Sequence, residues 1–282
     1  MSQKNPTQLF TSLYYAHYKP LDWGRFAWFV FFLIAMYVEQ MSPAERRQKW
    51  PYVRAWFGVL PDVLPCRTCV GHFSKYMAKQ GELNPDTCSL CRIFYHLRQT
   101  IRRRVMRTEW EKCKGDTTLQ WKCLMKQVKR SYSYEETVGW YRRQTLQTCV
   151  DSVLSFLHFV ALTYPDLHEE ALGKNQSSQQ RREAIQRLLC EILPVILPMP
   201  QAWWTKWQIM CRDLKVWVNR YTLMIALYQC THAAGYLPAY DQRNEGLDMY
   251  INRVHQRLLP ARNPGVIAGT VPVKMCACDA DD

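Results

Sequence analysis

Glycine is scarce in this sequence, at 11 of 282 residues, and long stretches contain no turn signal. Folds built from many strands and tight turns use glycine in those turns, so the shortage favours a mostly helical chain. Residues 1–10 are polar and lack the character of a signal peptide. The most apolar run, residues 26–38, has only 13 residues, which is too few to cross a bilayer. We expect a buried helix there, no membrane span, and an intracellular, cytoplasmic protein.

Acidic residues are also in deficit, with 24 Asp and Glu against 37 Lys and Arg and a net charge of +13. Because the basic residues are spread along the chain, solvated helix faces explain them, with an acidic partner as the alternative. Hydrophobic residues make up 48% of the sequence and aromatic residues 13%, which is typical of a packed globular protein. Twelve cysteines without a signal sequence favour metal binding or thiol chemistry over a secreted disulfide scaffold.

Periodicity and capping signals predict an all-α fold in two sets of helices. In the clearest start signal, Ser42 is the cap, Pro43 occupies the first helical position and Glu45 follows three residues after the cap. The first set is expected at residues 23–40, 43–59, 70–79 and 87–107. The second is expected from residue 135, with helices at 152–164, 181–192, 201–217 and 218–235 and a polar loop or linker at 173–180.

One short stretch carries a chemical signal. Cys66 and Cys69 follow Pro65 at the mouth of the helix expected at residues 70–79. A helix N-terminus favours a thiolate, and two cysteines one turn apart can close a reducible disulfide. The pair therefore predicts a redox dithiol.

A zinc site is the main alternative at these residues. The spacing from Cys66 and Cys69 to Cys88 and Cys91 suits a four-cysteine structural zinc site, with His72 as a spare ligand. Against zinc, the flanks are long apolar helices, whereas zinc knuckles usually lie in short glycine-punctuated loops. We therefore expect no metal. Cys88 and Cys91 are then either buried free thiols or partners of other cysteines.

Residues 60–66 can be aligned with residues 193–199, and an amphipathic helix precedes each stretch. We interpret this as two copies of one helical unit, with chance similarity as the alternative. Met199 and Ala202 stand in the second copy where the cysteine pair stands in the first. His158 on its apolar helix is expected to be a hydrogen-bonded core residue. Trp203, Trp204 and Trp207 are expected in a core or an interface.

These residues together resemble the Erv/ALR family of FAD-linked sulfhydryl oxidases. Gly24, Arg25 and Trp28 match the first-helix pattern Gly-Arg-x-x-Trp-x-x-x-His, with Phe32 at the histidine position, and Pro65-Cys66-Arg67-Thr68-Cys69 matches the redox pair. Arg98, Gln99 and Arg102 stand where the family has His-Asn-x-x-Asn. Residues 156–166 resemble the family's first helix with its histidine, His158, retained.

The resemblance implies a fold, an activity and a set of residues. The fold would be an Erv-like bundle at residues 23–130 after a lead-in at 1–22, a degenerate pseudo-Erv unit at 135–260 and a flexible tail at 261–282. Cys66 would be the outer sulfur attacked by a protein dithiol, and Cys69 would lie nearer FAD, which oxygen reoxidises to give hydrogen peroxide. Residues expected around FAD are Gly24, Arg25, Trp28, Phe32, Tyr37, Arg98, Gln99, Arg102 and Arg104.

The family also suggests roles for other cysteines. Cys276 and Cys278 in the tail resemble a shuttle pair, with incidental tail cysteines as the alternative, and Cys91 and Cys113 stand near the family's structural disulfide. The second unit would act as an intramolecular pseudo-dimer partner in place of, or beside, a homodimer. A large-DNA-virus source, with the protein in the host cytoplasm or the virion, would suit such an oxidase. A non-catalytic pseudo-oxidase scaffold is the third hypothesis. Arg102, Arg103 and Arg104 near Trp110 could touch nucleic acid, but no fold signature supports that partner.

Overall fold

The computed structural model describes residues 20–64, 67–112, 114–118, 120, 132–164, 176–212 and 220–233. Helices and their connections account for all of these residues, and no strand occurs among them. The prediction of an all-α fold is confirmed.

Four helices form the first set: α2 (Pro20–Gln40), α3 (Pro43–Val63), α4 (Arg67–Met77) and α5 (Leu90–Lys112). The predicted start of α3 is confirmed, because the Ser42 side chain accepts a hydrogen bond of 3.3 Å from the Glu45 amide. Its predicted end at residue 59 is wrong. Pro61 lies inside α3, and the Leu64 amide still donates to the Leu60 carbonyl at 2.9 Å, so the helix reaches Val63.

The second set follows α7 (Tyr134–Arg142), which is closed at its start by a capping box between Ser133 and Glu136. It contains α8 (Leu146–Leu162), α10 (Gln176–Arg187), a π-helical stretch η1 (Leu188–Ile192), α11 (Leu193–Ile196), α12 (Gln201–Arg212) and α13 (Arg220–Ala233). Helix α10 begins at Gln176, inside the stretch at 173–180 that the sequence indicated as a linker. Gln, Ser and Arg tolerate a helix well, and this one has apolar neighbours to pack against.

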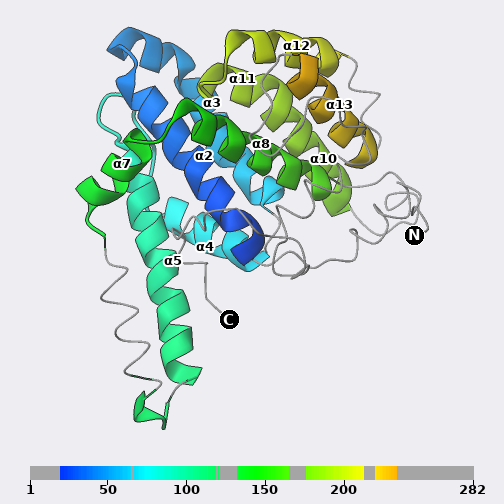
Figure 1. Ribbon diagram of the computed structural model, residues 1–282. Coiled ribbons are helices and arrows are strands. Elements are labelled where there is room, and N and C mark those ends of the chain that lie inside the picture. The colour runs from blue at the N-terminus through cyan, green and yellow to red at the C-terminus, as the bar shows by residue number, and fades with distance from the viewer. Residues whose placement is uncertain are drawn as a thin grey trace, which may run out of the picture.

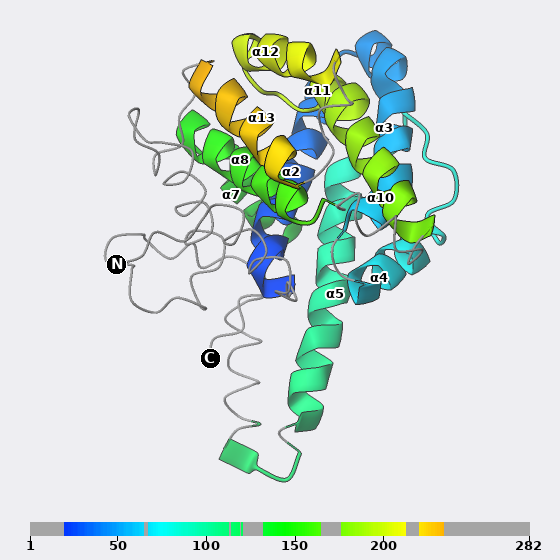
Figure 2. The same ribbon diagram turned by 90° about the vertical axis from the view of Figure 1, so that its right-hand side faces the viewer.

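The two sets pack against each other through equivalent helices (Figure 1). Helix α2 packs on α8, and α3 packs on α10. Contacts inside the second set repeat those inside the first. The contact of α2 with α5 corresponds to that of α8 with α13, and the contact of α4 with α5 corresponds to that of α12 with α13. The contact of α3 with α4 corresponds to that of η1 with α12. Figures 1 and 2 show α5 projecting beyond the other described helices.

Aromatic rings fill the core between α2, α3 and α5. The Phe94 ring lies 5.3 Å from both Phe31 and Trp56, and stacks on Phe57 at 5.5 Å between ring centroids. Trp56 and Phe94 are 1% and 0% exposed. Such rings contribute through both their area and their edge-to-face geometry.

The second set has a comparable core. Trp203 and Trp207 are fully buried and stack at 5.1 Å, so the tryptophan cluster lies in a core, as one of its two predicted locations. His158 is also fully buried on α8, which agrees with its prediction as a core histidine.

None of the described helices is, on its own, both long and apolar enough to cross a membrane. Helices α7 and α8 would pass that test only as a pair, and they are bent by 100° relative to each other.

Candidate dithiol site

The cysteine pair adjoins the first turn of α4. Helix α4 begins at Arg67, directly after Cys66, so Cys69 is its third residue. The Cys69 side chain is half-buried. Pro65 and Cys66 lie outside the described residues. The sequence predicted a helix starting near the pair, and the structure begins it within the motif itself.

Three contacts show at which end of the helix bundle the cysteine pair lies. Glu39 near the end of α2 accepts from the Cys91 amide near the start of α5 at 2.9 Å, and the Phe32 ring lies 6.4 Å from Phe94. Helices α2 and α5 are therefore antiparallel, which brings Arg25 level with Arg102. The Tyr76 hydroxyl, near the end of α4, donates to the Ile93 carbonyl at 3.2 Å.

The start of α4 accordingly points away from the start of α5. Cys69 is seven residues before Tyr76, which is about 10 Å along a helix. In Figures 1 and 2 the beginning of α2 and the whole of α4 lie toward the lower end of the bundle. We call the region where α2 begins, α3 ends and α4 begins the dithiol end.

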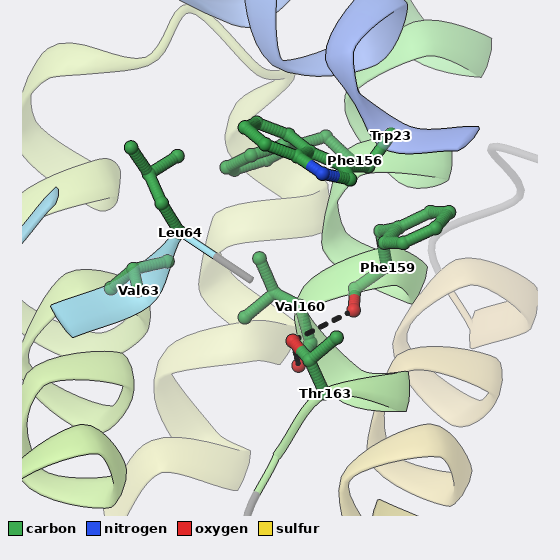
Figure 3. Close-up of a pocket in the computed structure, with 7 residues that line it drawn as sticks. All are labelled: Trp23, Val63, Leu64, Phe156, Phe159, Val160 and Thr163. Carbon is green, nitrogen blue, oxygen red and sulfur yellow. Dashed lines mark hydrogen bonds between the residues drawn. The ribbon is translucent and has the colours of Figure 1, made fainter. Parts of the chain in front are cut away.

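A small apolar cavity lies at the dithiol end (Figure 3). Its volume is about 10 Å³, the space of roughly one water molecule. Its lining comes from the start of α2, the end of α3 and the end of α8: Trp23, Val63, Leu64, Phe156, Phe159, Val160 and Thr163. The indole N–H of Trp23 is buried and has no hydrogen-bond partner among the described residues.

The expected FAD residues divide between two ends of the bundle. Gly24 is buried and Arg25 half-buried at the dithiol end, where the Arg25 guanidinium lies 4.5 Å above the Phe26 ring. Trp28 is 7% exposed and packs edge-on against Phe31 at 5.8 Å, one turn further along α2. Phe32 and Tyr37 lie progressively further from the dithiol end.

On α5 the residues expected around FAD differ in exposure. Arg102 is 7% exposed, whereas Arg104 is exposed and Arg98 half-buried. The side-chain amide of Gln99 donates to the Tyr132 carbonyl at 3.5 Å, so this residue faces the segment before α7. Buried arginine is rare unless it is paired.

Phe32, which stands where the Erv/ALR pattern has its first-helix histidine, lies in the core. It is 0% exposed and stacks on Tyr141 with ring centroids 4.4 Å apart. Tyr37 contacts the Lys49 ammonium, which lies 5.5 Å from its ring. These two side chains are packed against protein.

His72 lies one turn beyond Cys69 on α4. Burial, followed by the positive charges of Arg104 and Lys75, lowers the pKa of this imidazole below its usual value. His72 is therefore neutral at neutral pH and offers a nitrogen lone pair near the dithiol.

The second cysteine pair lies at the other end of the bundle. Cys88 is half-buried and Cys91 fully buried, and both are free thiols at the start of α5. The Glu39 carboxylate accepts from the Ser89 hydroxyl at 3.0 Å as well as from the Cys91 amide. Burial, and then the Glu39 charge, raises the pKa of the Cys91 thiol, and burial also raises that of Cys88. Both thiols are held in their protonated form.

The zinc alternative needs all four cysteines together. The antiparallel arrangement separates Cys69 from Cys88 and Cys91, and the described part of the chain contains no group of three metal-ligating side chains. The three cysteines of that predicted zinc site that the structure describes, Cys69, Cys88 and Cys91, therefore do not lie together.

The suggested Cys91–Cys113 pair does not suit the shape of α5. Cys91 is the second residue of this 23-residue helix, and Cys113 follows its last residue and lies outside the described residues. The helix is roughly 33 Å long, whereas a disulfide joins Cα atoms within about 7 Å. The tail residues Cys276 and Cys278 also lie outside the described residues.

The structure contains a disulfide that the sequence did not indicate. Cys190 in η1 is bonded to Cys211 in α12, with Cα atoms 5.7 Å apart and a sequence separation of 21. No recognisable spacing marks this pair. The sequence indicated only that Cys190 and Cys211 each lie on a helix expected in the second copy.

Comparison with protein-family models, with curated proteins and with solved structures finds no match in any of the three.

Proposed function

We propose that this chain is a flavin-linked thiol oxidase that makes disulfides in protein dithiols, with oxygen as the electron acceptor. The observation that supports the proposal best is the start of α4 inside the Cys66–Cys69 motif, which places the half-buried Cys69 in the first turn of the helix. The amide groups and dipole of a helix N-terminus favour a thiolate there. The proposal rests on this site and on the resemblance of the motifs.

The chemistry begins with thiol–disulfide exchange. A substrate thiolate attacks the Cys66 sulfur of the Cys66–Cys69 disulfide, and Cys69 leaves as a thiolate. The second substrate thiol then attacks its partner sulfur in the mixed disulfide and releases Cys66. The substrate has lost two electrons and two protons, and the enzyme dithiol has gained the electrons. Neutral His72, one turn from Cys69, is suited to take up a proton during this exchange.

The residues at the dithiol end fit a flavin nucleotide in the chemistry of their donors. Arg25 and the largely buried Arg102 are level on α2 and α5, and guanidinium groups suit pyrophosphate oxygens. The buried N–H of Trp23, which lacks a partner among the described residues, is a further donor. When bound, FAD supplies a two-electron acceptor that oxygen reoxidises with release of hydrogen peroxide. Phe32 and Tyr37, packed against protein, drop out of the proposed FAD-binding set.

We further propose that the two sets of helices are an Erv-like unit and a degenerate copy that forms an intramolecular pseudo-dimer. The repeated contact pattern supports this, as does the pairing of equivalent helices, α2 with α8 and α3 with α10. The second copy, with Met199 and Ala202 in place of the cysteine pair, would stabilise the first rather than react. The partners would be protein dithiols and oxygen, in an intracellular location.

The test is the visible absorption spectrum of the purified full chain, with a zinc assay on the same sample. We expect stoichiometric flavin that is bleached by added dithiol, and no bound zinc. Cys66→Ser and Cys69→Ser should each abolish oxygen consumption with a dithiol, whereas Cys149→Ser, on α8, should not. A colourless protein with one zinc would favour the four-cysteine module, and absence of both would favour a scaffold.

A further inference from the structure

One arginine of the second set binds the end of the helix that leads into the cysteine pair. Arg181, in the middle of α10, donates to three successive carbonyls at the end of α3 and its C-cap: Asp62 at 3.0 Å, Val63 at 2.8 Å and Leu64 at 3.2 Å. The same guanidinium donates to the carbonyl of Thr163 at 3.2 Å and to its hydroxyl at 3.0 Å. The neighbouring Gln180 amide donates to the Asp62 carboxylate at 3.1 Å.

The physical reason for this contact is the chemistry of helix ends. The last carbonyls of a helix have no intrahelical donor, and the helix dipole places partial negative charge there. The ends of α3 and α8 meet at the dithiol end, as the positions of Leu64 and Thr163 around the cavity in Figure 3 show. A planar guanidinium with five N–H donors can serve both ends at once.

These carbonyls lie immediately before the cysteine pair in the chain. Leu64 is held by Arg181, α4 begins at Arg67, and only Pro65 and Cys66 separate the two. The segment that carries Cys66 therefore leaves from a carbonyl fixed by a residue 117 positions further along the chain.

We propose that Arg181 is a positioning residue for the Cys66–Cys69 dithiol and sets its reduction potential. This inference rests on the proposed function, because it assumes that the pair cycles between dithiol and disulfide. Holding the end of α3 limits the positions open to Cys66 and so raises the effective concentration of one sulfur at the other. The second unit, which lacks a cysteine pair, thereby acts on the redox chemistry of the first.

The experiment measures the equilibrium of the full chain with mixtures of reduced and oxidised glutathione. Two glutathione thiols become one glutathione disulfide as the Cys66–Cys69 disulfide becomes two thiols, a transfer of two electrons and two protons. The extent of reduction is read for this pair alone by alkylation and peptide mass mapping. The measurement needs no bound flavin.

Arg181→Gln is expected to shift this equilibrium toward the dithiol by about tenfold, which for a two-electron couple is about 30 mV. Arg181→Lys keeps the charge but not the fork of donors, and should shift it by about threefold. Arg187→Gln is the matched control. Arg187 is exposed on the same helix and pairs only loosely with Glu191 at 3.7 Å, so we expect no shift.

Each outcome decides the question. If Arg181→Gln lowers the melting temperature but leaves the equilibrium within twofold of the wild type, Arg181 is a structural contact only and the proposal is overturned. If Arg181→Gln does not fold, Arg181→Lys decides in the same way. If the protein is colourless but Arg181→Gln still shifts the equilibrium with glutathione, the flavin proposal is overturned and the proposal for Arg181 is supported. Cysteines 66 and 69 that form no disulfide would overturn both.

Discussion

The disulfide between Cys190 and Cys211 should contribute strongly to the stability of the second set of helices. We consider the double substitution Cys190→Ala with Cys211→Ala. Both side chains are only partly buried, so the change removes little apolar contact. Its main effect is to free the loop that the bond closes in the unfolded chain.

The magnitude follows from the length of that loop. A sequence separation of 21 residues corresponds, in the chain-entropy relation, to about 3 kcal/mol of unfolding free energy at 25 °C. A chain of this size shifts its melting temperature by roughly 2 °C per kcal/mol, so we expect a fall of about 6 °C.

The assay is urea unfolding followed by tryptophan fluorescence, to which the buried Trp203 and Trp207 of α12 contribute. The Trp207 indole donates to the carbonyl of Leu189, the residue before Cys190. Mass mapping of the wild type should first recover the linked peptides of Cys190 and Cys211. Cys149→Ala, which removes a half-buried free thiol on α8, is the control and should leave the urea midpoint nearly unchanged. An unchanged midpoint for the double variant, in a wild type shown to be oxidised, would refute the loop-closure argument.

Two further predictions concern the half-buried Glu39 carboxylate and the buried Cys230 thiol. Glu39→Gln should lower the free energy of unfolding by about 1 kcal/mol in urea titrations, because it removes a carboxylate that binds the Cys91 amide at the positive end of α5. Burial raises the pKa of Cys230 from 9.0 to about 12. The neutral folded thiol therefore stabilises the protein below pH 9 and loses that contribution between pH 9 and 12. In urea titrations, wild type should lose roughly 1.4 kcal/mol per pH unit more than Cys230→Ala over this range.

Controls separate these effects from general ones. Glu191→Gln removes an equivalent charge from an exposed helix position and should change the stability by less than about 0.5 kcal/mol. A Glu39→Gln chain as stable as the wild type would show that the carboxylate does not stabilise α5. Parallel pH profiles for the wild type and Cys230→Ala would show that this thiol ionises equally well in both states.

Helix type was predictable where local signals agree. The Ser42, Pro43 and Glu45 sequence produced the predicted cap, because a hydroxyl acceptor and a ring with fixed φ act on their immediate neighbours. The apolar run on α2 indicated a buried helix, and that helix is central to the packing. Pro61 misled the prediction of where α3 ends, because a proline removes only its own hydrogen bond to the carbonyl four residues earlier, and the Leu64 amide still bonds to Leu60.

The candidate site was predictable only in part. Cys66 and Cys69 can be recognised because their chemistry depends on local spacing at a helix start. The burial of Arg102 could not be predicted, because an arginine at this position is exposed or buried according to which helix packs against α5. Phe32 likewise gives no sign in the sequence that Tyr141 will cover it.

By itself, the sequence determined that this protein is helical, where most of its helices begin, and which cysteines stand at the start of one of them. Those properties depend on residues within a few positions of one another. Only the tertiary structure decided that Cys190 is bonded to Cys211, that Cys88 and Cys91 lie away from Cys69, and that Arg181 holds the end of α3. Such arrangements involve parts of the chain that are distant in sequence, and they form only when helices bury their apolar faces against one another.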